Sequence, residues 1–205
     1  IFASNSIILL KNLFLAAFFI LLSFVNSRIW AQTRYPALNS IRGAHFVLND
    51  AKDSIYSKDL KNPSVQTIYL LLHAEIDSIG LDPGLTSEGR WRAIKLIKLF
   101  KEREIKAFFT TPFRRNILTL QPIVDSYGKE VIYYDNSDLK SFYKQLDLYK
   151  NGDFIVIVDK SYVKEIIANL TMMPFTENLS INSSEDFFVV QKSQNDKPKF
   201  WRFKY

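Results

Sequence analysis

A histidine and an arginine, two residue types that suit phosphate chemistry, each follow a segment predicted to be a buried strand. Residues 65–72 are an apolar run, and His73 comes directly after it. Residues 106–110 form a second short strand, followed by Arg114 and Arg115. Ligands of open α/β sheets bind beyond the carboxyl ends of the strands, where helix N-termini offer free N–H groups to anions. We therefore expect His73 and Arg115 to meet at one anion-binding site.

The elements that must position these residues alternate between strands and helices. Apolar runs predict strands at 65–72, 106–110, 130–134 and 154–158, and helical periodicity predicts helices at 86–103, 114–127, 138–149 and 161–170. Two further strands, 187–192 and 200–204, flank a turn. This alternation predicts an α/β three-layer sandwich, with a mostly parallel sheet, helices on both faces and a C-terminal β-hairpin.

The first 31 residues have the layout of a signal peptide or N-terminal anchor. Lys11 precedes an apolar run over residues 13–25, and a polar stretch follows. The run is shorter than the roughly 20 residues that a membrane-spanning helix needs. We expect the rest of the chain to be exported, either periplasmic or secreted, and either released or tethered through residues 13–25. Residues 32–64 are expected to be an extension with a short helix or two, packed on a domain formed by residues 65–205.

The amino-acid composition limits the kinds of site that the protein can contain. The 205 residues include two histidines and no cysteine, so disulfides, thiolate metal sites and cysteine nucleophiles are excluded. We expect no metal and no cofactor. The net charge of +6 comes from basic residues that are mixed with acidic ones, as over residues 95–104. This pattern is typical of a solvated surface, and we expect no nucleic-acid partner and no membrane contact beyond the N-terminal anchor.

Four segments resemble a known family when they are taken in order. They are TIYLLLHAE at 67–75, LTSEG at 85–89, TTPFRRNILT at 110–119 and IVIV at 155–158. Together they are similar to the phosphate pocket of the histidine phosphatase superfamily, the phosphoglycerate mutase-like proteins. The resemblance covers about residues 65–205 and implies an α/β fold and a phosphorylated small molecule or another anion as ligand.

The resemblance also implies roles for single residues. His73 matches the nucleophile that becomes a phosphohistidine. Arg115 matches the second of the two arginines that clamp the phosphoryl oxygens, and Arg114 lies beside it. These residues, together with Lys160, are the predicted catalytic and phosphate-binding groups.

Two of the groups that the family uses are missing here. Leu72 stands where the first arginine is expected. Lys160 falls where a second histidine is expected, although the turn is one residue short and Asp159 takes that place in the other alignment. Losing one preorganised donor typically lowers a rate by about 10²–10³-fold.

Three hypotheses follow from these departures. The first is a degenerate member, a pseudoenzyme that binds a phosphorylated or anionic ligand with weak or no catalysis. The second is an active phosphomonoester phosphatase that works through a phosphohistidine at His73. The third is a non-catalytic structural or interaction domain.

Overall fold

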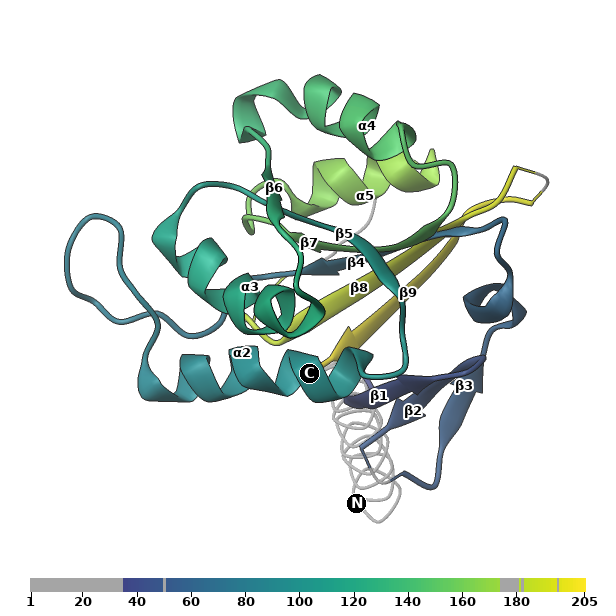
Figure 1. Ribbon diagram of the computed structural model, residues 1–205, viewed down its shortest axis with the longest axis horizontal. Helices are drawn as coiled ribbons and strands as arrows, with labels where there is room; N and C mark the ends of the chain where they lie inside the picture. The colour runs from purple at the N-terminus through teal and green to yellow at the C-terminus, as the bar shows by residue number, and fades with distance from the viewer. Residues whose placement is uncertain (1–34, 50, 174–180, 182, 195) are drawn as a thin grey trace, which may run out of the picture. The chain divides into compact units, whose positions relative to one another are not determined.

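The alternating pattern of the sequence forms a six-stranded mixed sheet in a computed structural model of the protein (Figure 1). The model describes residues 35–49, 51–173, 181, 183–194 and 196–205, so the predicted signal or anchor lies outside the described residues. The strand order is β6-β5-β7-β4-β8-β9. Four strands are parallel, namely β4 (Gln66–Leu71), β5 (Ile105–Thr110), β6 (Val131–Tyr133) and β7 (Gly152–Ile157). β8 (Asp186–Lys192) pairs antiparallel with β4, and β9 (Lys199–Lys204) pairs antiparallel with β8 to close the C-terminal hairpin.

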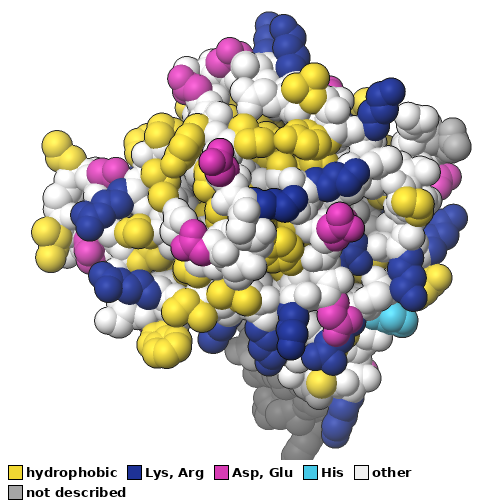
Figure 2. All heavy atoms as spheres, viewed as in Figure 1, with side chains coloured by type: hydrophobic (Ala, Val, Ile, Leu, Met, Phe, Trp, Pro, Cys, Tyr) yellow, Lys and Arg dark blue, Asp and Glu magenta, His cyan; other side chains and the backbone are white. Residues whose placement is uncertain are grey.

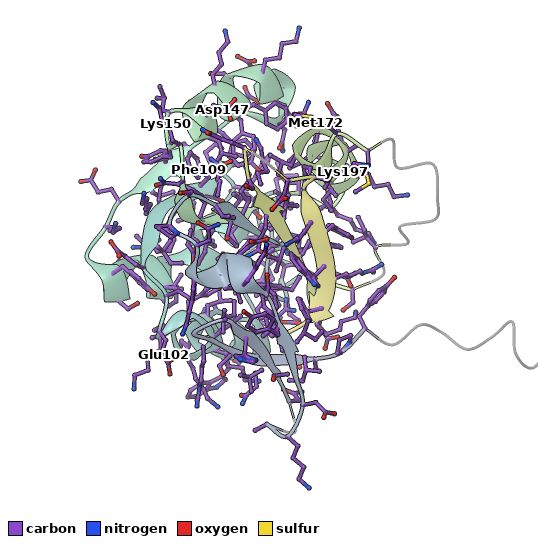
Figure 3. All side chains as sticks on the ribbon, turned by 90° about the vertical axis from the view of Figure 1, so that its right-hand side faces the viewer. Glu102, Phe109, Asp147, Lys150, Met172 and Lys197 are labelled. Atoms are coloured by element: carbon purple, nitrogen blue, oxygen red, sulfur yellow. The ribbon has the colours of Figure 1, made fainter. Side chains whose placement is uncertain are left out.

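Helices cover both faces of this sheet, which confirms the predicted three-layer sandwich. One face carries α2 (Ser87–Phe100) and α3 (Arg114–Tyr127), and the other carries α4 (Leu139–Asp147) and α5 (Val163–Thr171) (Figure 1). Successive strand residues point to opposite faces. On β5, Phe108 packs on the side of α2 and α3, and Phe109 packs on the side of α4 and α5. In Figure 3 Phe109 lies in the interior, whereas the charged side chains of Glu102 and Asp147 lie at the periphery.

The segment before β4 differs from the prediction of a short helix or two. Its described part forms an antiparallel sheet of β1 (Leu38–Arg42), β2 (His45–Leu48) and β3 (Ser54–Tyr56), followed by one 3-10 turn, η1 (Lys58–Lys61). Gly43, with φ of 54°, makes the tight turn between β1 and β2. Ile41 and Phe46 are fully buried in the core on the side of α2 and α3. Tertiary burial of these two side chains favours strands over the helix that we expected.

Charges are interspersed on the face of the molecule shown in Figure 2, where basic and acidic side chains alternate with apolar ones. Within the described ranges, no helix combines the length and the apolar character needed to cross a membrane. Residues 35–205 cluster into one compact unit, so the small N-terminal sheet and the six-stranded sheet fold together.

Candidate functional site

The carboxyl ends of β4, β5 and β7 open into a cavity of about 1010 Å³. These strands are parallel neighbours, so their ends meet at one edge of the sheet. His73 follows β4, Arg115 lies in the first turn of α3 after β5, and Lys160 follows β7; all three line the cavity. The topology therefore brings together three of the four residues that we predicted for the site.

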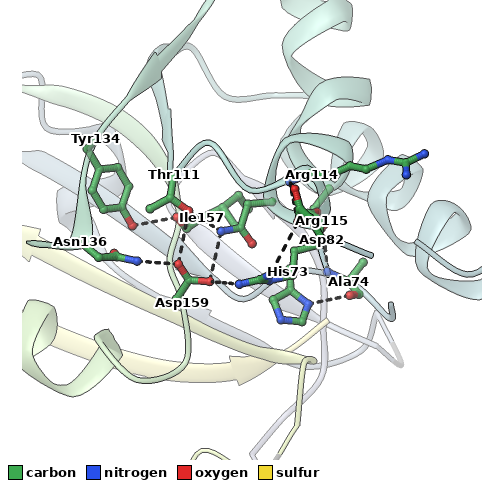
Figure 4. A network of polar contacts seen from close by, with 12 residues as sticks. His73, Ala74, Asp82, Thr111, Arg114, Arg115, Tyr134, Asn136, Ile157 and Asp159 are labelled. Carbon is green, nitrogen blue, oxygen red and sulfur yellow. Dashed lines mark hydrogen bonds and ion pairs between the residues drawn. The ribbon is translucent and has the colours of Figure 1, made fainter. Parts of the chain in front are cut away.

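The imidazole of His73 is held in one orientation. Its Nδ1 lies 2.9 Å from the carbonyl oxygen of Ala74 (Figure 4). A carbonyl oxygen only accepts, so Nδ1 carries the proton and Nε2 keeps its lone pair. Ala74 N in turn donates to Thr119 Oγ1 at 2.9 Å, and that hydroxyl donates to Arg115 O at 2.8 Å. The loop that carries His73 is thereby fixed to α3, with a nitrogen available as a nucleophile or hydrogen-bond acceptor.

A buried ion pair lies behind the same loop. Arg92 Nη2 donates to the carbonyl oxygen of His73 at 3.2 Å, and Arg92 Nε lies 3.1 Å from Glu75 Oε2. Glu75 also accepts a hydrogen bond from Ser184 Oγ at 3.2 Å. Helix α2 approaches the loop so closely that a Cβ on Gly89 would stand 2.2 Å from Glu75 O. These contacts fix the backbone on which His73 is mounted.

Two carboxylates compensate the charge of Arg115. Its Nη2 lies 3.2 Å from Asp159 Oδ1, and its Nη1 lies 3.8 Å from Asp82 Oδ1. The carboxylate of Asp82 also accepts from the backbone N–H of Arg114, at 2.9 Å. The first free N–H of α3, which would favour an external anion, is therefore occupied by a side chain of the protein itself.

The sequence left open whether Asp159 or Lys160 takes the place of the second histidine, and in the structure Asp159 makes the contacts at that place. Its Oδ1 accepts from Arg115 Nη2 and from Asn116 Nδ2 at 3.3 Å. Its Oδ2 accepts from Asn136 Nδ2 at 2.7 Å and from Thr111 Oγ1 at 3.3 Å (Figure 4). A carboxylate with four donors therefore stands next to Arg115, where the resemblance expects a histidine.

Three residues that the sequence analysis singled out contribute less to anion binding at the carboxyl edge of the sheet, namely Lys160, Arg114 and Leu72. Lys160 is exposed at the rim of the cavity, and no residue that the structure describes forms an ion pair with its ammonium. The side chain of Arg114 is exposed and points away from His73 (Figure 4). We therefore leave Arg114 out of the site. Leu72 is buried in the core on the side of α4 and α5, and it offers no donor in place of the first arginine.

Comparison with known proteins agrees with this geometry. Residues 68–137 match the model of the histidine phosphatase superfamily, branch 1. This match spans about a third of the chain, and over it the sequence is similar to the histidine phosphatase superfamily. Among curated protein sequences, none matches the chain.

Solved structures of this superfamily fold lie at low sequence identity. The protein histidine phosphatase SixA, complexed with tungstate, is 16% identical with a TM-score of 0.56. A mycobacterial glucosyl-3-phosphoglycerate phosphatase with inorganic phosphate is 9% identical with a TM-score of 0.53. A phosphoserine phosphatase from Entamoeba histolytica, in complex with 3-phosphoglyceric acid, is 15% identical with a TM-score of 0.52. Each comparison covers 68% of this chain and 97% of the other, and at these identities it shows the fold.

The far wall of the cavity in this histidine phosphatase fold is aromatic and polar. Phe113, Tyr133, Phe142 and Tyr162 line it, together with Tyr134, whose hydroxyl donates to Ile157 O at 3.0 Å. Burial, with the negative charge of Asp159 as a second cause, raises the pKa of Tyr134 above its usual value. Tyr134 is therefore a fixed hydrogen-bond donor and not a proton-transfer group at neutral pH. In the described part of the chain, no group of three acidic or histidine side chains could hold a metal ion.

Sequence reasoning missed the neutral groups that hold Asp159, namely Thr111, Asn116 and Asn136. It also missed Thr119 and Arg92, which support the loop of His73. Thr111 and Asn136 come just after β5 and β6, so their positions at strand ends were the signal that could have identified them. Arg92 lies in the middle of α2 and carries no such signal.

Proposed function

We propose that this domain binds a phosphorylated small molecule or another anion in the cavity, with weak or absent phosphoryl transfer. The ion pair between Arg115 and Asp159 is the observation that carries this proposal. Catalysis of phosphoryl transfer depends on preorganised donors that stabilise charge developing on the oxygens. Here one donor is shared with a carboxylate and another is replaced by Leu72, so transition-state stabilisation is reduced more than simple ligand binding is.

The groups that remain can still hold an anion. The cavity is bordered by the guanidinium of Arg115, the ammonium of Lys160 and the imidazole of His73. Arg115 keeps 20% of its side chain exposed, which leaves it reachable from the cavity. The phosphatases of similar fold that were solved with inorganic phosphate and with 3-phosphoglyceric acid support an anionic ligand as well.

A second candidate, a phosphomonoester phosphatase, is favoured by the orientation of His73. With Nδ1–H donating to Ala74 O, the Nε2 lone pair is free to attack phosphorus. The P–O bond to the leaving alcohol would break as the P–N bond forms, and water would then cleave the phosphohistidine to release phosphate. That route needs cationic donors on the phosphoryl oxygens, and among the described residues that line the cavity these are Arg115 and Lys160.

Hydrolysis of p-nitrophenyl phosphate separates the two candidates. The intact chain is compared with His73→Ala and with His45→Ala, which removes an exposed histidine outside the cavity. We expect all three proteins to give the same low rate. A rate well above this background that is lost in His73→Ala and retained in His45→Ala would establish the phosphatase and overturn the proposal.

Thermal unfolding in the presence of phenyl sulfate or phenyl phosphate tests binding itself. A ligand that binds only the folded state raises the melting temperature in a concentration-dependent way. We expect this stabilisation in the intact chain and in Arg114→Ala, and its loss in Arg115→Ala. If neither anion stabilises the intact chain, the domain is the structural or interaction module of the third hypothesis.

We also propose that the domain acts after export, because residues 13–25 form an apolar run preceded by Lys11. Fractionation of cells that express the full chain tests this proposal. Recovery of the chain in the cytoplasmic fraction at its full mass would contradict it.

A further inference from the structure

The carboxylate of Asp159 has the surroundings of a bound oxyanion. Asp159 is 8% exposed, and its two oxygens accept from a guanidinium, two amides and a hydroxyl. Two of these donor residues, Thr111 and Asn116, are themselves almost fully buried. Thr111 directly follows β5 and Asn116 lies in α3, so the donors are fixed by the fold before any ligand arrives. A side chain of the protein thus fills an anion subsite beside His73.

The charges that border this edge of the cavity can be compared directly. Arg115 and Lys160 are the cations, and Asp159 is a buried anion in contact with Arg115. Asp82 is a further carboxylate 3.8 Å from Arg115, but it is half exposed and therefore better screened by water. Asp135 and Asp138 line the cavity as well, and both are exposed. Asp159 is the buried carboxylate at this edge and already offsets the charge of Arg115, so a ligand with two negative charges is repelled more strongly than a ligand with one.

We infer that Asp159 is the specificity-determining residue of this cavity and restricts the bound group to a single negative charge. This inference rests on the proposed function. Carboxylates, sulfate esters and phosphodiesters meet that condition. A phosphomonoester does not, because its second pKa is near 6 and it is a dianion at neutral pH. Like charges in a partly dehydrated site repel strongly enough to decide between the two classes.

Phenyl sulfate and phenyl phosphate provide matched probes, since they have the same ring and similar tetrahedral groups but differ in charge. Binding of each to the full chain is measured by titration calorimetry at about pH 8, where the phosphate ester is a dianion. We expect the intact chain to bind phenyl sulfate about tenfold or more tightly than phenyl phosphate. Asp159→Asn should shift this ratio about tenfold or more toward the phosphate.

Asp135→Asn is the control for the loss of one negative charge. Asp135 lines the same cavity but is exposed, its Oδ1 accepts from Ser137 N, and the ion pairs of Arg115 among the described residues are with Asp82 and Asp159. We expect it to leave the ratio within about twofold of that of the intact chain. An equal shift in both variants would mean that overall charge, and not Asp159, selects the ligand.

Two further outcomes separate the inference from the proposed function. An intact chain that prefers phenyl phosphate, with binding lost in Arg115→Ala, overturns the role of Asp159 and keeps the anion site. This comparison uses the unaltered protein, so it decides the matter even if Asp159→Asn does not fold. If neither probe binds the intact chain or Asp159→Asn, the proposed function and the inference both fail.

Discussion

Arg92 donates from Nη2 to the backbone carbonyl of His73, 3.2 Å away, so a buried guanidinium supports the one histidine that lines the cavity. The same guanidinium pairs with Glu75. Replacing Arg92 by Met removes both contacts and leaves a partly buried carboxylate unpaired. We expect Arg92→Met to lower the free energy of unfolding by about 3 kcal/mol in urea titrations.

Arg90→Met is the matched control, because Arg90 is exposed on the same helix. It should change the free energy of unfolding by less than about 0.5 kcal/mol. Equal effects of the two substitutions would show that the loss of a surface charge, and not the support of the His73 loop, explains the result.

The contact between Gly89 and Glu75 predicts an unusual glycine effect. Alanine normally stabilises a helix relative to glycine by about 0.5–1 kcal/mol. A Cβ at position 89 would lie 2.2 Å from Glu75 O, so we expect Gly89→Ala to destabilise the fold by about 1–3 kcal/mol. Gly84→Ala meets its nearest atoms at 3.6–3.7 Å and should be close to neutral. Measured melting temperatures that rise in Gly89→Ala would refute the close approach of α2.

Thr119 joins the loop of His73 to α3 through its hydroxyl. Thr119→Val keeps the shape of the side chain but leaves the buried N–H of Ala74 without its acceptor. We expect a loss of about 1–3 kcal/mol in the free energy of unfolding. Thr171→Val removes a hydroxyl bond to Ile167 O of the same helix and a long contact of 3.4 Å from the N–H of Met173, which is exposed, so the loss should be smaller. The reverse ranking in urea unfolding would contradict this role of Thr119.

Two tyrosines that pack on Phe142 should respond in opposite ways to the loss of their hydroxyls. The hydroxyl of Tyr143 is buried and has no hydrogen-bond partner among the described residues, whereas that of Tyr134 donates to Ile157 O. We expect Tyr143→Phe to be neutral or stabilising and Tyr134→Phe to cost about 1 kcal/mol in the free energy of unfolding. A larger loss in Tyr143→Phe would indicate a partner for its hydroxyl.

The stability of the protein at alkaline pH provides an independent test of the burial of the Tyr143 hydroxyl. Burial, followed by the charge of Glu165, raises the pKa of Tyr143 to about 12, against about 10 in an unfolded chain. Between these values the folded state keeps a proton that the unfolded state has lost, so stability falls as the pH rises from about 10 to 12. In Tyr143→Phe this contribution is absent, and the urea midpoint should decline less steeply over that range.

The sequence was sufficient to predict the six-stranded sheet and the helices around it. Helix α3 has the predicted bounds, because Arg114 follows a proline-containing turn and Gly128 ends the helix in the left-handed conformation. The apolar runs that became β4 and β7 are bounded by polar residues and shifted by two residues at most. The small sheet of residues 38–56 was not predicted, since its strands are short and depend on burial against the main core.

The site was predictable where topology alone decides position. His73 and Arg115 lie beyond the carboxyl ends of β4 and β5, the parallel strands on either side of β7, and any sheet with this order brings them to one edge. The choice between Asp159 and Lys160 was not predictable, because a shift of one residue in a turn decides which side chain faces inward. The amides of Asn116 and Asn136 reach Asp159 only through the folded arrangement of α3 and η2 (Asn136–Asp138).

Residues 36 and 37, just before the small sheet, lie along the outer edge of β9. Ala37 bridges Lys204, and Lys204 N donates to Pro36 O at 3.0 Å. Unpaired strand edges recruit strands from other molecules. A chain shortened to residues 65–205 would bare this edge together with the apolar surface of Phe203 that Phe46 now covers. We expect it to self-associate in size-exclusion chromatography, because residues 36–37 and the small sheet shield the hairpin from the strands of another molecule.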